Sequence, residues 1–304
     1  MAQKIILDVD TGGDDAVAIL LAGHHPRIEL VAVTVCHGNG PLELTLDNTL
    51  RVLQAGHLEK TPVYAGSECP LIGDLIQTHP IQKSTLPLPP AGITPTAGRA
   101  VDFIVDYYLG PGGPETIYTP IGPQTNLALA LRLEPAIAER IPRIVTMAGA
   151  FTEGNMTPSA EFNILADPEA AHIVFNSGIP ITMVGLEVTS RALVSLEDAD
   201  RLRKINTPQA QAASGIIRDE VNWFIDNLGL EGGQIFDACA VAAIIDPQIV
   251  QTRKMHVNIE LHGNLTRGRT VADISGYHPV EQNVDVGIDI DRAKFLDIIF
   301  EGLS

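Results

Sequence analysis

The chain of 304 residues is 45% hydrophobic, which suffices for the core of one large α/β domain or two modest ones. Its 37 acidic and 20 basic residues give a net charge of −17, so we expect no nucleic acid partner, whereas a small ligand bound with a cation is compatible with this charge. No apolar run reaches the roughly 20 residues of a membrane span, and no basic-then-apolar signal precedes the first strand, so we expect a soluble, cytoplasmic protein without a membrane partner.

The first predicted strand ends in a turn that is rich in carboxylates. Apolar residues surround Asp8 in this strand, and Asp10 ends it. A Thr-Gly-Gly loop follows, and Asp14 and Asp15 then open an apolar helix over 16–22. One of these residues could be an ordinary helix cap, but four neighbouring carboxylates repel one another unless protons or a cation neutralise them. The turn therefore predicts a site for a hard divalent cation.

Further strands and helices alternate after this turn. Apolar runs predict strands at 28–35, 62–65, 116–119, 144–147, 181–184, 255–261, 270–273 and 283–290. Helical spacing predicts helices at 42–54, 100–108, 124–133, 168–176, 196–204, 208–228, 236–245 and 292–300. Between 66 and 98 the periodicity fails and prolines accumulate, which predicts a long functional loop or lid.

This alternation predicts an α/β fold in a single domain spanning residues 1–304. We expect an open, mainly parallel, mixed sheet of Rossmann-like type with helices on both faces. The late strands, with fewer helices between them, form either an antiparallel edge or a satellite sheet. Ligands of such sheets bind at the carboxyl ends of the strands, and polar residues follow four predicted strands, at 10–15, 37–39, 119–126 and 148–163.

Other sequence features concern cysteines and polar residues of the later loops. Three cysteines, at 36, 69 and 239, show no metal-binding spacing, so we expect buried free thiols. Glu161 and Asn163 flank an aromatic residue in a loop that also holds Asn155, and such side chains bind sugar hydroxyls or simply make turns. Asp237 opens a predicted helix, where an aspartate serves as a cap or as a ligand.

Several segments together resemble the inosine-uridine preferring nucleoside hydrolase family. They read ILDVDTGGDDAVAILLA, VCHGN, GPQTNLALALRLEP, MAGAFTEGNMTPSAEFNILADPEAAHIVF and FDACAVAAIIDP, and the likeness runs from residue 4 into the last helix. The resemblance implies calcium-dependent hydrolysis of the N-glycosidic bond of ribonucleosides to ribose and free base. It also implies a nucleoside hydrolase fold and a homodimer or homotetramer.

The resemblance further implies a role for each matched position. Calcium (Ca²⁺) is held by the side chains of Asp10, Asp15 and Asp237 and by the backbone carbonyl of Thr125, an oxygen-only set that suits this ion. A calcium-bound water attacks the anomeric carbon, with Asp10 as the base.

The sugar and pocket positions follow in the same way. Four residues are implied to grip the ribose hydroxyls: Asp14, Asn155, Glu161 and Asn163. Asn39 supports both ribose and metal, and Met147 and Phe162 line the pocket. Hydrogen bonds to the 2′- and 3′-hydroxyls hold the sugar toward an oxocarbenium-like geometry, as in glycosidases.

One position departs from the family pattern. Many members carry a histidine immediately before the aspartate that matches Asp237, and this histidine can protonate the departing base; here the residue is Phe236. A phenyl ring donates no proton, so a general acid contribution of typically ~10²–10⁴-fold comes from elsewhere or is lost. Phe236 could instead stack on the base. His37 and His79 are weak candidates for a substitute acid.

Three points stay open at this stage. Trp223 and Phe224 either cap the base or belong to the core. Asp8 and Asp10 also fit the DxDxT signature of a haloacid dehalogenase type phosphohydrolase, although no fitting late acidic pair or lysine follows. Phe236 alone would support a non-catalytic riboside-binding protein. The sequence does not predict base preference or the choice between ribose and deoxyribose.

Overall fold

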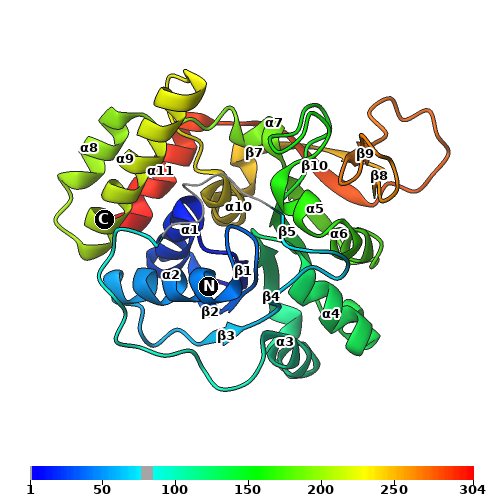
Figure 1. The fold of residues 1–304 in the computed structure, drawn as a ribbon, viewed down its shortest axis with the longest axis horizontal. Coiled ribbons are helices and arrows are strands. Elements are labelled where there is room, and N and C mark those ends of the chain that lie inside the picture. The colour runs from blue at the N-terminus through cyan, green and yellow to red at the C-terminus, as the bar shows by residue number, and fades with distance from the viewer. Residues whose placement is uncertain (1, 77–84) are drawn as a thin grey trace.

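An eight-stranded sheet with helices on both faces forms the centre of the molecule (Figure 1). The computed structural model describes residues 2–76 and 85–304. The strand order is β3-β2-β1-β4-β5-β6-β10-β7, and the described neighbours pair in parallel except β10 with β7, which are antiparallel. The strands are β1 (Gln3–Val9), β2 (Ile28–Val35), β3 (Val63–Ala65), β4 (Thr116–Pro120), β5 (Ile144–Met147), β6 (Ile181–Val184), β7 (Val250–Met255) and β10 (Val284–Ile290).

The helices connect these strands and cover both faces of the sheet. The α-helices are α1 (Gly13–His24), α2 (Leu42–Ala55), α3 (Ala100–Leu109), α4 (Thr125–Leu133), α5 (Phe162–Ala166), α6 (Pro168–Phe175), α7 (Leu186–Thr189), α8 (Leu196–Arg203), α9 (Pro208–Leu228), α10 (Phe236–Ile245) and α11 (Arg292–Leu303). Short 3₁₀ helices are η2 (Gly113–Glu115), η3 (Pro135–Glu139) and η4 (Pro247–Ile249). No helix within the described ranges is long and apolar enough to cross a membrane.

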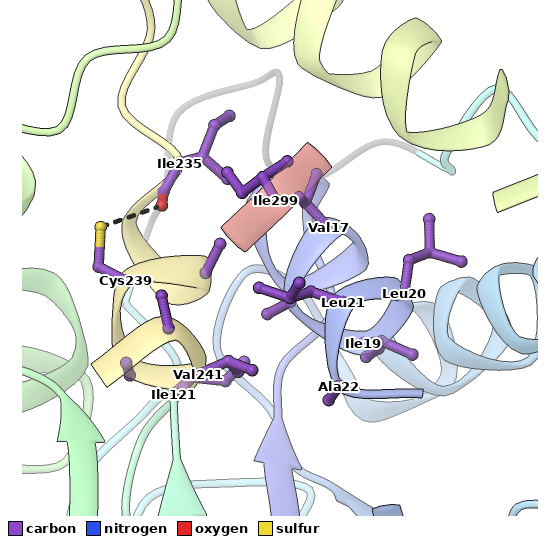
Figure 2. Packing of buried hydrophobic residues seen from close by; sticks show 14 of the residues in the cluster. Val17, Ile19, Leu20, Leu21, Ala22, Ile121, Ile235, Cys239, Val241 and Ile299 are labelled. Carbon is purple, nitrogen blue, oxygen red and sulfur yellow. Dashed lines mark hydrogen bonds between the residues drawn. The ribbon is translucent and has the colours of Figure 1, made fainter. Parts of the chain in front are cut away.

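Two apolar cores lie against the two faces of the sheet. Successive side chains of a strand point to opposite faces, so Ile5 and Leu7 of β1 join one core while Ile6 joins the other. The first core includes residues of α1, α9, α10 and α11, and the second includes residues of α3, α4 and α6. Figure 2 shows the first core between α1 and α10, where Leu21 and Val241 are buried. Burial of both faces explains why the strands read as continuous apolar runs.

The fold class predicted from the sequence is confirmed, and both alternatives for the late strands occur. β7 and β10 form the antiparallel edge, while β8 (Val257–Ile259) and β9 (Thr270–Ala272) form a separate two-stranded sheet that projects to one side in Figure 1. The sequence did not predict β7, α5 or α7. None of the three cysteines is in a disulfide, but Cys69 is exposed, so the expectation that all three are buried is wrong.

The segment over 66–98 is irregular where the structure describes it. Residues 66–76 and 85–98 contain no helix or strand. Leu86 is buried and donates its backbone N–H to Asn48 Oδ1 at 2.9 Å, and Leu71 donates its backbone N–H to Asp167 Oδ2 at 2.9 Å. These bonds attach both ends of the segment to the domain, and its role as a lid stays a prediction.

Asp8 is a structural residue in the middle of the sheet. Its Oδ1 accepts hydrogen bonds from Thr34 Oγ1 at 2.6 Å and from Asn126 Nδ2 at 2.8 Å, which ties β1 to β2 and to the start of α4. Burial raises the pKa of Asp8 to about 6, and the hydrogen bonds from Thr34 and Asn126 act in the opposite direction. Its Oδ2 has no hydrogen-bond partner among the described residues.

We expect Asp8→Ala to lower the free energy of unfolding by about 2–4 kcal/mol, because it leaves two buried donors unpaired. Asp8→Asn keeps an acceptor oxygen, so we expect a smaller loss. Urea unfolding followed by circular dichroism measures both values. An Asp8→Ala variant as stable as the wild type would contradict this role for Asp8.

Candidate active site

The turn after β1 is held by the side chain of Asp15. Asp15 Oδ1 accepts the backbone N–H of Asp10 at 3.2 Å, and Oδ2 accepts the backbone N–H of Gly12 at 2.9 Å and Nδ2 of Asn39 at 3.3 Å. These bonds close the loop around the N-terminus of α1, where the helix dipole favours a negative charge. Asp15 is therefore fixed in place by the loop that it closes.

Asp10 is enclosed by backbone on both sides of its carboxylate. Oδ2 accepts the backbone N–H of Asn39 at 2.6 Å. A Cβ atom at Gly38 would collide with this oxygen, and a Cβ atom at Gly122 would collide with Oδ1. Only glycine fits at these two positions while Asp10 keeps this orientation, so the loops after β2 and β4 both shape the site.

Asp237 brings a further carboxylate from a distant part of the sequence. It lies in the first turn of α10, and its carboxylate meets those of Asp14 and Asp15, with one oxygen of each within 4.8 Å of the others. Carboxylates so close together form a candidate site for a metal ion.

Burial raises the pKa of every carboxyl group in this cluster, and repulsion between carboxylates adds to this effect for Asp10, Asp15 and Asp237. Burial, followed by repulsion from Asp15, raises the pKa of Asp10 well above its usual range. Burial is also the main cause that raises the pKa of Asp14 to about 6 and that of Asp15 to about 7. The pKa of Asp237 is raised well above its usual range by burial and then by Asp14. A divalent cation would remove this repulsion, so the donor set fits one.

A second polar group comes from the loop after β5. Glu161 caps α5, and its carboxylate accepts the backbone N–H groups of Gly149 at 2.8 Å, Asn163 at 2.8 Å and Ile164 at 3.2 Å. Burial raises its pKa, and these bonds act in the opposite direction. Asn155 Oδ1 accepts the backbone N–H of Phe162, the residue after Glu161, at 3.0 Å.

Asn163 joins this loop to the ends of β4 and β5. Its Nδ2 donates to the carbonyl oxygens of Ile121 at 2.9 Å and Met147 at 3.0 Å. The amide is thereby held at the carboxyl end of the sheet, beside the carboxylate cluster.

These groups line one pocket, which we call the polar pocket. Its lining is formed by Asp10, Asp14, Asn39, Ile121, Met147, Asn155, Glu161, Phe162, Asn163, Phe236 and Asp237. The structure thus brings together every sugar-binding residue that the sequence analysis named, along with Asp10 and Asp237. Asn39 Oδ1 is buried here with no hydrogen-bond partner among the described residues, so an acceptor remains free for a cation or a ligand.

Comparison with known proteins identifies the family. Residues 5–297 match the family described as "Inosine-uridine preferring nucleoside hydrolase". The chain belongs to this family. As a nucleoside hydrolase it is an enzyme that acts on N-glycosidic bonds, and the resemblance seen in the sequence is confirmed.

Individual nucleoside hydrolases resemble the chain over its full length. It is 38% identical over 303 residues to the pyrimidine-specific ribonucleoside hydrolase RihB of Escherichia coli strain SE11, covering 98% of this chain and 96% of that protein. The purine-preferring ribonucleoside hydrolase from Gardnerella vaginalis superposes with a TM-score of 0.91 at 32% identity, covering 99% and 98% of the two chains. A plant nucleoside hydrolase, PpNRh1, gives a TM-score of 0.91 at 25% identity, covering 100% and 99%.

Thr125 does not lie in the polar pocket of this nucleoside hydrolase. Its hydroxyl donates to Asp167 Oδ2 at 2.7 Å and contacts His37 Nε2 at 3.2 Å. Ile121 lines the pocket, and its carbonyl oxygen accepts a hydrogen bond from Asn163 Nδ2 at 2.9 Å. The backbone carbonyl of Thr125 as a calcium ligand stays a prediction.

The candidate acids on the base side have different positions. His37 is buried beside Thr125, and burial lowers its pKa to about 4, so it is neutral at physiological pH. It does not line the polar pocket, and His79 lies outside the described residues. Phe236 does line the pocket, and its ring centroid is 6.0 Å from that of Phe224, which is itself buried.

We expect Ca²⁺ to stabilise the protein more at pH 8 than at pH 5. The pKa values of Asp14 and Asp15 are raised in the folded state, so their protonated forms favour folding below about pH 4. That contribution is lost as the pH rises through about 6 to 7, when the charges repel. Thermal unfolding with Ca²⁺ and with a chelator at each pH should give a melting-temperature gain about 5–10 °C larger at pH 8. An equal gain at both pH values would contradict this.

Proposed function

We propose that the polar pocket carries out calcium-dependent hydrolysis of ribonucleosides to ribose and free base. The observation that carries the proposal is the convergence of carboxylates and amides in the lining of one pocket. The carboxylates are those of Asp10, Asp14 and Asp237, and Asp15 lies beside the last two. A cluster of carboxylates suits a hard divalent cation, which prefers oxygen ligands. The amides supply hydrogen-bond donors and acceptors for vicinal hydroxyls.

The chain offers an oxygen-only ligand set for calcium. Asp10, Asp15 and Asp237 would hold the ion, with the backbone carbonyl of Thr125 as the fourth protein ligand. The unpaired Asn39 Oδ1 offers one more oxygen near Asp10 and Asp15. When bound, calcium supplies a Lewis acid that lowers the pKa of water and fixes its orientation.

The chain's own residues perform the remaining chemistry. Asp10 accepts the proton of the attacking water as the general base, the role that the family resemblance implies for it. Asp14 and Glu161 accept hydrogen bonds from ribose hydroxyls. Their negative charges also stabilise the positive charge that develops at the anomeric carbon as the C–N bond breaks. Asn155, from the loop after β5, and Asn163, from the start of α5, orient the sugar.

The leaving base receives no proton from position 236. Phe236 presents an apolar ring at the mouth of the polar pocket, so we propose that it packs on the base and that protonation comes from solvent or another group. Reactions whose leaving group needs a proton are therefore expected to be slower than those with an activated leaving group.

Self-association is the second part of the proposal. Five of the large hydrophobic residues that are exposed lie on or near the β8–β9 sheet: Leu265, Val271, Ile274, Tyr277 and Val280. Exposed apolar side chains gathered in this way favour a protein interface. Together with the family resemblance this supports a homodimer or homotetramer, which light scattering tests.

We expect release of reducing sugar from a panel of purine and pyrimidine ribosides, including p-nitrophenyl riboside, in the presence of Ca²⁺. Asp10→Asn should lower kcat by at least ~10²-fold on every substrate, because it removes the base and a metal ligand. The exposed Asp297→Asn on α11 serves as a variant with the same charge change away from the polar pocket. No release from any riboside would overturn the proposal.

Phe236→His tests the missing acid. A histidine at this position can donate a proton to the departing base, so we expect the ratio of kcat/KM for inosine to that for p-nitrophenyl riboside to rise by ~10-fold or more. The nitrophenolate leaving group needs no proton and therefore serves as the internal control. If wild type binds ribosides tightly without turning over either substrate, the chain is a riboside-binding protein instead.

A further inference from the structure

Glu220 is a carboxylate that the proposed mechanism does not use. It lies on α9 and packs against the first residue of α1, where a Cβ atom at Gly13 would collide with Glu220 Oε1. Its carboxylate makes no hydrogen bond or ion pair with the residues that the structure describes. Burial, followed by repulsion from Asp14, raises its pKa to about 8. An unpaired and largely buried carboxyl group is costly, so a ligand partner would offset its desolvation.

Glu220 faces a cavity of about 390 Å³, which we call the α9 cavity. It lies between α9, the turn before α1 and the segment around Leu86, and its lining is Gly12, Gly13, Leu86, Pro87, Ile216, Asp219, Glu220, Asn222, Trp223, Asp226 and Asn227. The volume is within the range of small-molecule sites. The charged residues in this lining are all acidic, so the cavity favours a neutral ligand that presents N–H donors. Asp219 and Asp226 are exposed to water, whereas Glu220 is partly buried.

The α9 cavity adjoins the polar pocket. Gly12 and Gly13 line the cavity, and the next residue, Asp14, lines the polar pocket, so the same turn borders both. A row of aromatic rings also connects them, since Phe236 is 6.0 Å from Phe224 and Phe224 is 5.2 Å from Trp223 between ring centroids. The polar pocket encloses only about 40 Å³, so a base attached to a sugar bound there must extend beyond it.

We propose that the base of the nucleoside enters the α9 cavity and that Glu220 accepts a hydrogen bond from an exocyclic amino group of that base. This inference rests on the proposed function and adds a specificity-determining residue to it. Trp223 lines the same cavity. An amino group would give the carboxyl group of Glu220 a hydrogen-bond partner, and a base without one leaves it unpaired, which is the usual physical basis for discrimination.

The test compares substrates that differ only in the amino group. The pairs are adenosine with purine riboside and cytidine with pyrimidin-2-one riboside. We expect Glu220→Ala to lower kcat/KM by about 5- to 30-fold for adenosine or cytidine and by no more than about twofold for its partner without the amino group. Glu220→Gln keeps an acceptor oxygen, so it should retain most of the preference. The exposed Asp297→Asn on α11, outside the lining of both pockets, should leave the ratios within about twofold.

The outcomes separate this inference from the proposed function. An equal loss on both members of each pair, or no loss on either, would overturn the role of Glu220 while turnover of ribosides continued. If no riboside is hydrolysed by the wild type, the proposed function fails. The same comparison made on dissociation constants from calorimetry then decides whether Glu220 binds the amino group. Folding of each variant is checked by its thermal unfolding.

Discussion

The mutual repulsion of buried carboxylates is the constraint on which the site depends. Asp10, Asp14, Asp15 and Asp237 meet at the end of β1, and each has a raised pKa because burial disfavours the charge. Repulsion from neighbouring carboxylates adds to this effect for all but Asp14. Burying several carboxylates together costs free energy when no cation neutralises their charges. The cost is acceptable when the charges serve to bind a cation and to stabilise a cationic sugar in the transition state.

The fold keeps these charges together by enclosing each one in backbone. Asp15 is bonded to the turn that it closes, Asp10 lies between two glycine positions, and Asp237 is carried in by α10, which packs on α1 (Figure 2). Parallel strands bring the loops after β1, β2, β4 and β5 to the same edge of the sheet. The sugar-binding amides therefore meet the carboxylates although they come from separate parts of the chain.

The alternation of apolar strands and helices was sufficient to predict the sheet and most of the helices, because strands buried on both faces leave a clear pattern. β7 was not predicted, because it lies at the edge of the sheet and has four exposed residues in its middle, so it shows no continuous apolar pattern. The site residues with charged or amide side chains were predicted through the family resemblance. Glu220 could not be found in this way, because its place against α1 depends on the missing side chain at Gly13.

Calcium titration by isothermal calorimetry on the purified full-length chain tests the central claim most directly. We predict one Ca²⁺ bound per chain, with affinity lost or lowered by at least ~10-fold in Asp15→Asn and in Asp237→Asn, and unchanged in the exposed Asp226→Asn. Absence of Ca²⁺ binding by the wild type, or binding that is the same in all three variants, would contradict the assignment of the carboxylate cluster as a metal site.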